Sequence, residues 1–578
     1  MHHLTVLNRQ LNKRFSYSES LRFKNKTIYL NQKYSLRHWD SFFDRQRQRQ
    51  LILLGRPAIN LDSWASYDND PAFVTRSLNN DLNELPFGEF CIKTNGSFSL
   101  LIADFFNQTL SIIRDKFGVF PIFVSGEHSI DDIQVSTHPD ILAVHSGNCS
   151  LDKTSVAEFL ADGYVSHPCT FYKEVTSINP GSFLTVDYRR HKVSQTQYFS
   201  CDSDLCYDFT SLVNELSDAL SSSIKRRSHP QYGQTGVLLS GGGDSRPLAV
   251  NTITKPHAFT SFSTKNKEFQ ITREITERLK VDHHVIKRTS ASNSIGLTKS
   301  PRYTGGMSTG GSATLMDLLR DDSLLKMDNL LSGDYADWLL KDIAFNTAPV
   351  TIFGKKLPLN RFSDFSFHFY GGSVPIPALQ NRIADRRNSI FPPSERQQSN
   401  ALQFRRIVPL SNEYTSSTRL FLQRTLPWES YLIDNDVINC VLRIPPDFKL
   451  NGRLYDQALK ILCRPIIDIP HASKGTRLGT NQYVTAFWMT LAMLKTKFGK
   501  DSQTHQATWD KPGAIMHSDS SLHKLFYSAN PSSQKYITDV IGLDIFSLSI
   551  GEIYRIDYHL FFNVISFCAW LETNDISV

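Results

Sequence analysis

Between residues 88 and 114 the chain alternates short apolar runs with turn-forming residues, as successive β-hairpins do. The runs span residues 88–92, 97–103 and 109–114, and Asn95-Gly96 and Asn107-Gln108 lie between them. Because Asn-Gly and similar pairs favour tight turns between adjacent strands, this stretch predicts an antiparallel sheet. The N-terminal part of the chain is therefore expected to be β-rich.

A helical pattern replaces the hairpin pattern near residue 209. Residues 209–228 carry one apolar face at helical spacing, formed by Leu212, Val213, Leu216, Leu220 and Ile224. Strand candidates at 237–239, 258–263 and 281–286 then alternate with a charged helix at 269–279. Alternating strands and helices predict a parallel α/β sheet, in which ligands bind at the carboxyl ends of the strands.

The change of pattern predicts a domain boundary between about residues 195 and 208. We therefore expect an N-terminal domain over residues 1–198 and a second domain over residues 208–578. A length of 578 residues also favours more than one domain. Apolar helices between residues 542 and 571 are expected to end the second domain.

Hydrophobic residues make up 40% of the chain and charged residues 21%, which is typical of a soluble globular protein. The net charge of +7 comes mostly from scattered Lys and Arg, so a nucleic-acid partner is not expected. The longest apolar tract, near residues 561–571, is too short to cross a bilayer, and no signal peptide is evident. Eight cysteines without metal-ligand spacing favour the reducing cytoplasm.

Three consecutive glycines interrupt the stretch from Gly236 to Val250. The order of strand, then Ser240-Gly241-Gly242-Gly243-Asp244-Ser245, then helix predicts a phosphate loop, because glycines let the backbone approach a ligand closely. No lysine lies within this loop, which argues against a Walker-type loop and kinase-like transfer of a terminal phosphate. Asp244 would repel a phosphate unless a cation joined the two, so Mg²⁺ is the expected bridge.

The segment from Ser240 to Ser245 resembles the pyrophosphatase loop of the ATP-dependent amide-forming enzymes related to asparagine synthetase. The resemblance implies that ATP is cleaved to AMP and pyrophosphate, with Mg²⁺ as the metal cofactor. It also implies a set of nucleotide-binding residues: Ser240, Gly241, Gly242, Gly243, Asp244, Ser245, Ser263 and Gly333.

A second constellation, Leu330-Leu331-Ser332-Gly333-Asp334-Tyr335-Ala336-Asp337, also follows an apolar strand-like run. It resembles the Leu-Ser-Gly-x-x-x-Asp segment of the same family. By that resemblance Asp337 joins Asp244 as a metal ligand, and Asp334 takes a catalytic position that faces the substrate. Tyr335 and Trp338 depart from the family, which has a small residue and a glutamate there, so the resemblance does not define the substrate pocket.

Two further residues are candidates for the chemistry. Lys474, in the stretch from Ile469 to Gly475, resembles the family lysine that stabilises charge as an adenylate forms or collapses. Glu429 is a candidate proton acceptor. His283 and His284 suggest a metal site, but neighbours on a strand point to opposite faces, so a structural role is favoured.

The N-terminal part has a resemblance of its own. Asn95-Gly96-x-Phe98, Asp104 and the run from Arg114 to Phe123 are similar to the C-terminal half of the glutaminase domain in asparagine synthetase. Such glutaminases attack glutamine with an N-terminal cysteine, whereas this sequence begins Met1-His2-His3 and its first cysteine, Cys91, lies in a predicted strand. We therefore expect an inactive glutaminase-like domain, as in the β-lactam synthetase and lasso-peptide cyclase subgroup.

Together these features predict an α/β protein with an N-terminal β-rich sandwich of the Ntn glutaminase type. A parallel-sheet ATP pyrophosphatase domain that ends in helices is expected to follow it. The expected reaction activates a small-molecule or peptide carboxylate as an acyl-adenylate, which ammonia or a substrate amine then attacks.

Several alternatives remain beside this function. An intramolecular cyclase of the lasso-peptide or β-lactam type would use the same loop, and a peptide substrate would imply partner proteins. A tRNA-modifying enzyme shares the loop but requires a basic groove or catalytic cysteines, which the sequence does not indicate. A nucleotide-binding protein without turnover is the last alternative, against which the intact Asp244 and Asp337 argue.

Overall fold

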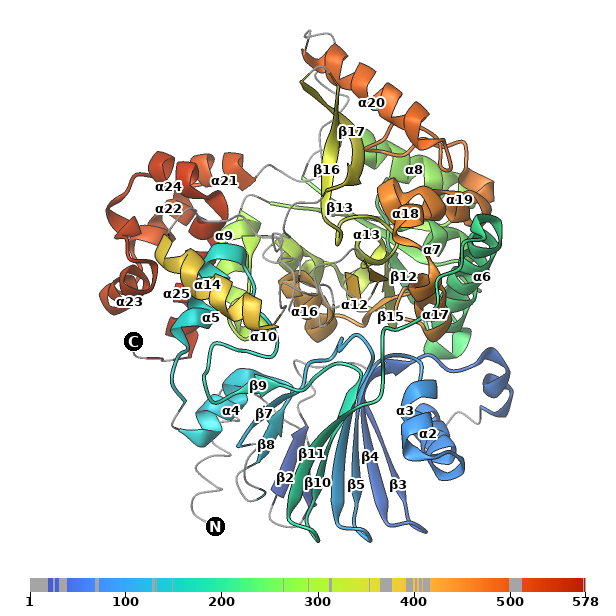
Figure 1. Cartoon of the computed structure of the whole chain (residues 1–578), viewed down its shortest axis with the longest axis vertical. Helices are drawn as coiled ribbons and strands as arrows, with labels where there is room; N and C mark the ends of the chain where they lie inside the picture. The colour runs from blue at the N-terminus through green and yellow to red at the C-terminus, as the bar shows by residue number, and fades with distance from the viewer. Residues whose placement is uncertain are drawn as a thin grey trace.

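The computed structural model describes residues 19–23, 26–30, 39–67, 72–126, 130, 133–147, 149–263, 265–289, 291–310, 314–352, 354–363, 377–390, 399–400, 403–404, 408, 416–497, 512–574 and 576. An antiparallel sheet from the N-terminal part lies below a larger body built around a parallel sheet (Figure 1). The expected N-terminal residues Met1-His2-His3 lie outside the described residues.

Six antiparallel strands form the larger N-terminal sheet, in the order β11-β10-β6-β5-β4-β3. In chain order they are β3 (Trp39–Asp44), β4 (Arg49–Pro57), β5 (Gly96–Asp104), β6 (Thr109–Arg114), β10 (Ser182–Asp187) and β11 (Lys192–Gln197). A second sheet contains β7 (Phe123–Ser125), β8 (Gln134–Ser136) and β9 (Thr176–Ser177), and β1 (Glu19–Phe23) pairs with β2 (Lys26–Leu30). The strands predicted at 97–103 and 109–114 are confirmed as β5 and β6.

Alternating side chains of the large sheet enter two different cores, as the period of a strand requires. Ala103, Leu110 and Ile112 pack with Val124 of the second sheet, so a buried apolar layer joins the two sheets. Leu100, on the opposite face, packs against α2 (Phe73–Glu84) and α3 (Phe87–Lys93). The N-terminal part is therefore a β-rich sandwich, as predicted, and α2 and α3 cover its outer face.

The strand expected at residues 88–92 is wrong, because these residues belong to helix α3. Phe87, Phe90 and Cys91 all pack in the core beneath the helix, at a spacing of three and four residues. This spacing places them on one face of a helix, whereas a strand would have pointed Phe90 and Cys91 in opposite directions. Cys91 is consequently a buried core residue of α3.

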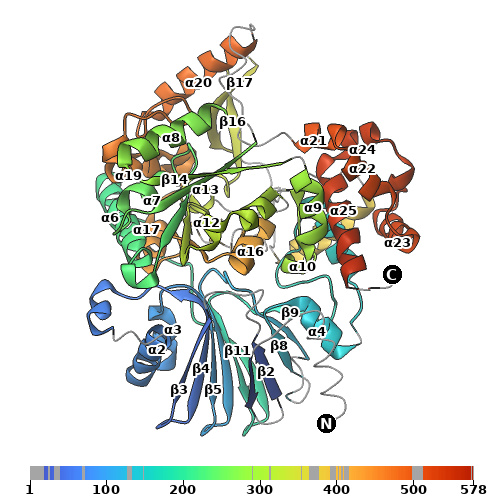
Figure 2. The same ribbon diagram turned by 180° about the vertical axis from the view of Figure 1, so that it is seen from behind.

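The parallel sheet predicted for the second domain is present, and all its strand pairs are parallel. Its strand order is β14-β13-β12-β15-β18. Its strands are β12 (Thr235–Leu238), β13 (His257–Phe262), β14 (Asp282–Lys287), β15 (Asn329–Ser332) and β18 (Trp428–Ser430). The helices α6 (Phe209–Arg227), α7 (Arg246–Asn251) and α8 (Lys267–Leu279) confirm the alternation of strands and helices. Seen from behind, α7 and α8 lie over one face of this sheet (Figure 2).

Helix α6 shows why this part folds as predicted. The side chain of Asp208 accepts a hydrogen bond from the Ser211 amide and so caps the start of the helix. Leu216 and Leu220 are fully buried and belong to one core with Val237 of β12. The apolar stripe therefore fixes α6 against the parallel sheet.

Many further helices surround the two sheets. They are α4 (Pro139–Ser146), α5 (Lys153–Asp162), α9 (Ala291–Lys299), α10 (Pro301–Thr304), α12 (Asp322–Leu325), α13 (Ala336–Leu339), α14 (Pro377–Ile390), α16 (Ser416–Thr425), α17 (Asn435–Arg443), α18 (Pro446–Lys449), α19 (Arg453–Leu462), α20 (Gln482–Lys497), α21 (Pro512–Ser518), α22 (Ser520–Tyr527), α23 (Pro531–Ile541), α24 (Ile550–Ile556) and α25 (Tyr558–Thr573). None of those helices, over their described residues, is long and apolar enough to cross a membrane.

The predicted C-terminal helices pack against part of the N-terminal half, by which we mean the chain up to the end of β11. Asn563 of α25 donates a hydrogen bond of 3.1 Å to the carbonyl oxygen of Phe159 in α5. Trp570 Nε1 donates to Asp140 Oδ2 at 3.1 Å, and Val156 and Phe171 share a core with α25. Residues from α4 to about Tyr172 therefore join the C-terminal helices, and Figure 1 shows α5 among them.

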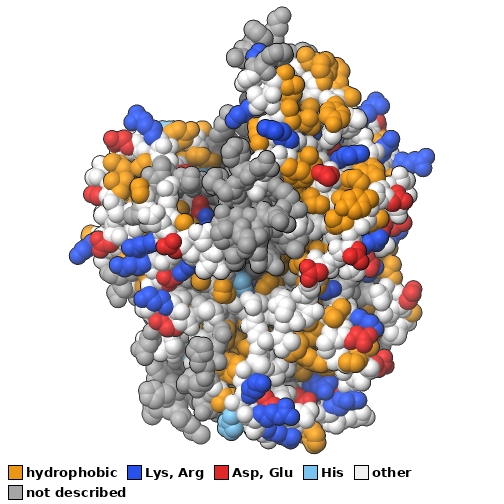
Figure 3. Space-filling model, viewed as in Figure 1, with side chains coloured by type: hydrophobic (Ala, Val, Ile, Leu, Met, Phe, Trp, Pro, Cys, Tyr) orange, Lys and Arg blue, Asp and Glu red, His pale blue; other side chains and the backbone are white. Residues whose placement is uncertain are grey.

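One part of the structure projects away from the body. Helix α20 and the hairpin of β16 (Thr347–Ile352) and β17 (Lys355–Phe362) stand at the top of the view in Figure 1. Hydrophobic side chains gather on this upper part of the surface (Figure 3). Tyr483, Val484, Phe487 and Trp488 of α20 are all exposed.

Candidate active site

The predicted phosphate loop lies at the carboxyl end of β12 and leads into α7. Two serines close it, because the Ser240 amide donates to Ser245 Oγ at 2.9 Å and the two hydroxyl oxygens are 3.1 Å apart. Ser263 follows β13, the neighbouring strand, at the same edge of the sheet. The structure thus places Ser240, Ser245 and Ser263 where the parallel sheet offers a ligand site.

Two of the three loop glycines, Gly241 and Gly243, pack closely against other parts of the chain. None of them has a φ in the left-handed region. A Cβ added at Gly241 would lie 2.7 Å from the Cβ of Ala472, and one added at Gly243 would lie 3.0 Å from Leu459 Cδ1. The Ala472 amide also donates to the Gly241 carbonyl oxygen at 3.0 Å. The loop backbone is therefore pressed against the segment that carries Lys474.

Two side chains accept hydrogen bonds from loop amides that a phosphate would otherwise use. Glu268 Oε1 accepts from the Gly241 amide at 3.2 Å, and His471 Nε2 accepts from the Gly243 amide at 3.0 Å. Burial, together with the nearby positive charges of Lys474 and Arg246, holds the pKa of His471 well below its usual value. His471 therefore stays a neutral acceptor, and a phosphate that bound these two amides would have to displace both side chains.

The two predicted metal ligands lie on the loops that follow adjacent strands, and a lysine joins them. Lys341 Nζ lies 2.9 Å from Asp244 Oδ1 and 2.6 Å from Asp337 Oδ1. Sequence reasoning missed Lys341. Its spacing of four residues from Asp337 is the signal that would have found it, because such pairs meet on one side of a helical turn.

Asp244 and Asp337 suit Mg²⁺ by their donor chemistry. Mg²⁺ in nucleotide sites is commonly held by one or two carboxylates, with phosphate oxygens and waters as its other ligands. Over the residues described, no cluster of three or more His, Cys, Asp or Glu residues could hold a metal ion by itself. The aspartate pair therefore fits a metal that arrives with a nucleotide.

Gly333 brings the second loop against the first. A Cβ at this position would lie 2.6 Å from the carbonyl oxygen of Asp244, so no larger residue fits without a shift of the backbone. The Tyr431 hydroxyl donates to the same carbonyl oxygen at 3.0 Å and lies 3.0 Å from the hydroxyl of Tyr455. These contacts fix Asp244 at the point where the loops after β12 and β15 meet.

Asp334 lies beside Gly333, where the Ser332 hydroxyl donates to its Oδ2 at 2.8 Å. The next residue, Tyr335, has a φ of 80° and a buried side chain. Its ring lies 5.6 Å from that of Phe117, which belongs to the N-terminal half. Tyr335 therefore fills the contact between the two halves, while Asp334 stays at the sheet edge.

Lys474 reaches Asp456 of α19, with 2.7 Å between Lys474 Nζ and Asp456 Oδ2. Its own segment crosses the phosphate loop, as the contact between Ala472 and Gly241 shows. Burial raises the pKa of Asp244, and the charges of Lys341 and Lys474 oppose that rise. Lys474 therefore lies within electrostatic reach of the loop carboxylate.

Glu429 is not brought to the loop. It is buried on β18, and its nearest ion-pair partner is Arg227 of α6, with 3.5 Å between Arg227 Nε and Glu429 Oε2. Burial raises its pKa, and the charges of Arg227 and Arg56 counteract that rise. Arg227 is thus the ion-pair partner of Glu429 in the structure, and the expected role of Glu429 as proton acceptor stays a prediction.

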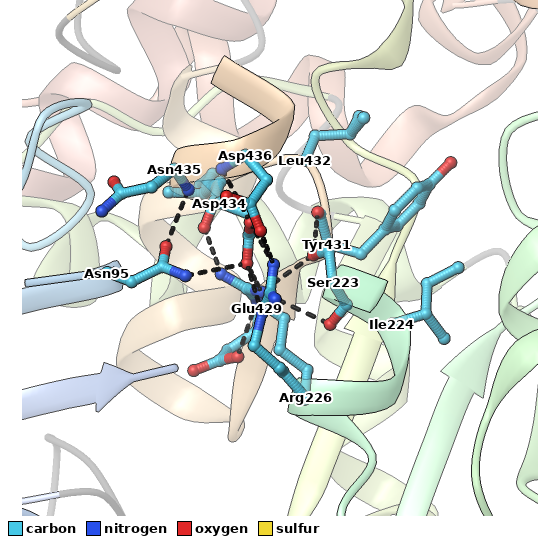
Figure 4. A network of polar contacts seen from close by, with 12 residues as sticks. Asn95, Ser223, Ile224, Arg226, Glu429, Tyr431, Leu432, Asp434, Asn435 and Asp436 are labelled. Atoms are coloured by element: carbon cyan, nitrogen blue, oxygen red, sulfur yellow. Dashed lines mark hydrogen bonds and ion pairs between the residues drawn. The ribbon is translucent and has the colours of Figure 1, made fainter. Parts of the chain in front are cut away.

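A polar network next to Glu429 joins the two halves (Figure 4). Asp434 accepts from Arg226 Nη2 at 2.7 Å and from Arg227 Nη1 at 2.8 Å. Asn95, in the turn before β5, donates to Asp434 at 3.1 Å and accepts from the Asn435 amide at 2.8 Å. The turn that resembled a glutaminase segment thus directly contacts the part of the chain that carries the parallel sheet.

Comparison with known proteins finds similarity mainly in the N-terminal part of the chain. Residues 85–199 match the sequence profile of the glutamine amidotransferase domain family. The chain is also 25% identical over 157 residues to the asparagine synthetase (glutamine-hydrolysing) 1 of Bacillus subtilis strain 168. The match covers 27% of this chain and about a quarter (24%) of that relative. The chain is therefore similar to a glutamine amidotransferase domain over residues 85–199 and to an asparagine synthetase over part of its length.

Two solved structures are similar over part of their length. One is the allosteric regulatory enzyme of purine biosynthesis, with 10% identity and a TM-score of 0.19 over 42% of this chain and 61% of the other. The second is the glutamine phosphoribosylpyrophosphate amidotransferase of B. subtilis, with 10% identity and a TM-score of 0.18 over 42% and 62%. At such scores the likeness carries no argument about the site.

Proposed function

We propose that this protein is an ATP-dependent, AMP-forming ligase that makes an amide bond. The observation that carries the proposal is the meeting of Asp244 and Asp337, from the loops after β12 and β15, beside a glycine-rich phosphate loop. The partial similarity to asparagine synthetase supports the same class of reaction. ATP is the proposed nucleotide and Mg²⁺ the proposed metal.

The proposed reaction has two steps. A substrate carboxylate attacks the α-phosphorus of ATP, the bond to pyrophosphate breaks, and an acyl-adenylate forms. An amine then attacks the acyl carbon, AMP leaves, and the amine loses a proton. Mg²⁺, when bound, would supply charge neutralisation at the phosphates.

The chain's own residues would position the nucleotide and its charge. The loop amides of Gly241 and Gly243 would bind phosphate oxygens once Glu268 and His471 have been displaced. Asp244 and Asp337 would hold the metal, and Lys474 would stabilise negative charge that develops at the adenylate. Asp334 is the proposed contact for the substrate, because its carboxylate lies at the same edge of the sheet.

The amine is proposed to be ammonia or part of a substrate. Cys91 would be the nearest cysteine for a glutaminase, but its thiol is fully buried. Burial raises its pKa to about 12, so the reactive thiolate is scarce near neutral pH. A nucleophilic role for Cys91 is therefore not part of the proposal.

The test is to follow the fate of ATP and the mass of the product. Purified protein is incubated with ATP, Mg²⁺, ammonia and a panel of carboxylates and peptides, and AMP, ADP and pyrophosphate are separated. The proposal expects AMP and pyrophosphate in equal amounts. Amidation replaces OH by NH₂, whereas cyclisation loses water, so product mass separates the ligase from the cyclase. Formation of ADP, or modified tRNA as the product, would contradict the proposal.

Lys474 gives a prediction about turnover. We expect Lys474→Ala to lower kcat by about 10² to 10³-fold with little change in KM for ATP, because its ammonium would meet charge that develops in the transition state. Steady-state kinetics of pyrophosphate release measure both constants. Lys460→Ala is the matched control, since Lys460 is an exposed lysine on α19, the helix that carries Asp456. A normal kcat for Lys474→Ala would show that this lysine has no part in the chemistry.

A further inference from the structure

Lys341 is the one residue in direct contact with both proposed metal ligands among the contacts that the structure describes. It follows α13, the short helix that begins at the β15 loop. Its stem packs beside Gly452, where an added Cβ would lie 3.4 Å from Lys341 Cγ. Its ammonium lies 5.7 Å from the centre of the Tyr455 ring. These contacts define the position of the ammonium beside the two carboxylates.

The charge of Lys341 is stabilised by its neighbours. Its ammonium lies within ion-pair distance of the carboxylates of both Asp244 and Asp337. The ammonium is consequently the resident counter-ion of the pair. It leaves the two carboxylates and the lysine with one net negative charge in place of two.

The ammonium occupies the place that a bridging divalent cation would need. Mg²⁺ binds carboxylate oxygens at about 2.0 to 2.1 Å, so an ion shared by both aspartates would lie between them. Lys341 Nζ already lies there, 2.9 Å from Asp244 and 2.6 Å from Asp337. Two cations at this point would repel each other strongly, because the site is only partly open to water.

We propose that Lys341 is a positioning residue that keeps divalent cations off the aspartate pair until a nucleotide arrives. The inference rests on the proposed function, because it assigns Lys341 a role at that same site. The phosphates of a nucleotide give the ammonium a new partner and supply the metal with additional ligands. The flexible four-carbon stem of lysine allows its ammonium to move between the two positions.

The test measures metal binding without turnover. Mn²⁺ is titrated into the nucleotide-free protein, and free Mn²⁺ is followed by electron paramagnetic resonance. We expect Lys341→Met to bind Mn²⁺ about tenfold more tightly than the unsubstituted protein, or better, because a competing positive charge has been removed. Lys341→Arg keeps the charge and is expected to bind as weakly as the unsubstituted protein.

Controls locate the effect and guard against misfolding. Lys255→Met removes an exposed lysine that lies beyond the opposite end of α7 from Asp244, and it should leave Mn²⁺ binding unchanged. Asp337→Asn, added to Lys341→Met, should remove the gain, which would assign it to the aspartate pair. Lys341→Gln provides a second neutral variant in case the methionine variant unfolds below the assay temperature.

The outcome separates this inference from the proposed function. Equal Mn²⁺ affinity, within about twofold, for the folded neutral variants and the unsubstituted protein would overturn the role of Lys341, and so would a loss of affinity. Neither result depends on whether ATP is cleaved. Conversely, a protein that forms no AMP but shows the gain in Lys341→Met would retain this inference and lose the proposed reaction.

Discussion

Pyrophosphate release is expected to fall by about 10³-fold or more in Asp244→Asn, with the protein still folded. The proposed role of Asp244 is to hold Mg²⁺ against the phosphates, and loss of such a ligand removes several kcal/mol of charge stabilisation. The substitution keeps the size of the side chain. The hydrogen bond from Tyr431 is also kept, because it is made to the backbone oxygen of Asp244. A coupled enzymatic assay for pyrophosphate measures the effect.

Asp337→Asn is the companion variant and is expected to show a loss of similar size. Asp282→Asn serves as the control, because Asp282 is an exposed aspartate of β14 in the same parallel sheet. Thermal unfolding of all three variants should lie close to that of the unsubstituted protein. Pyrophosphate release that persists in both Asp244→Asn and Asp337→Asn would remove these residues from the mechanism.

The features that local sequence determines were predicted well. The apolar stripe of α6 and the strand, glycine loop and helix around Gly241 depend on residues that are close in the sequence. The two antiparallel strands β5 and β6 likewise follow from contiguous apolar runs and their turns. Residues 88–92 were misjudged because Phe, Cys and Ile favour strands, while the spacing of Phe87, Phe90 and Cys91 suits a helix.

The contacts that depend on distant parts of the chain could not be predicted. His471 lies 228 residues from the loop glycine whose amide it accepts, and only the fold brings the two together. Glu429 was expected to accept a proton, yet its ion-pair partner in the structure is Arg227 of α6, about 200 residues earlier in the chain. The positive φ of Tyr335 and its packing on Phe117 also depend on tertiary structure. Thus the loop chemistry was predictable from sequence, whereas the groups that surround it were not.

The network around Asp434 carries the second large expected effect. Asp434 is completely buried, and its partner Arg227 is 1% exposed. We expect Asp434→Asn to lower the free energy of unfolding by about 3 to 5 kcal/mol, because it removes the buried negative charge that Arg226 and Arg227 share and leaves Arg227 with Glu429 at 3.5 Å as its ion-pair partner. Since Asn95 also loses a charged partner, the N-terminal sheet should separate from the rest at lower denaturant concentration. Chemical denaturation, followed by tryptophan fluorescence and circular dichroism, measures both changes.

Asp436→Asn is a closely matched control for this prediction. Asp436 also pairs with Arg226 at 2.7 Å, but its side chain is 58% exposed. Exposed ion pairs contribute about 0 to 1 kcal/mol, so this variant should be nearly as stable as the unsubstituted protein. Equal losses in Asp434→Asn and Asp436→Asn would show that burial is not the cause of the effect.

Acid should reduce the difference between Asp434→Asn and the unsubstituted protein. Burial alone would raise the pKa of Asp434, but Arg227 and Arg226 hold it below its usual value of 3.8. A carboxyl whose pKa is lowered by folding stabilises the native state fully above its unfolded pKa and loses that contribution as pH falls through the folded pKa. The variant lacks this titration, so its stability should decline less steeply below about pH 4. Denaturation curves at neutral and acidic pH test this, and a constant difference between the two proteins would contradict the role assigned to the Asp434 charge.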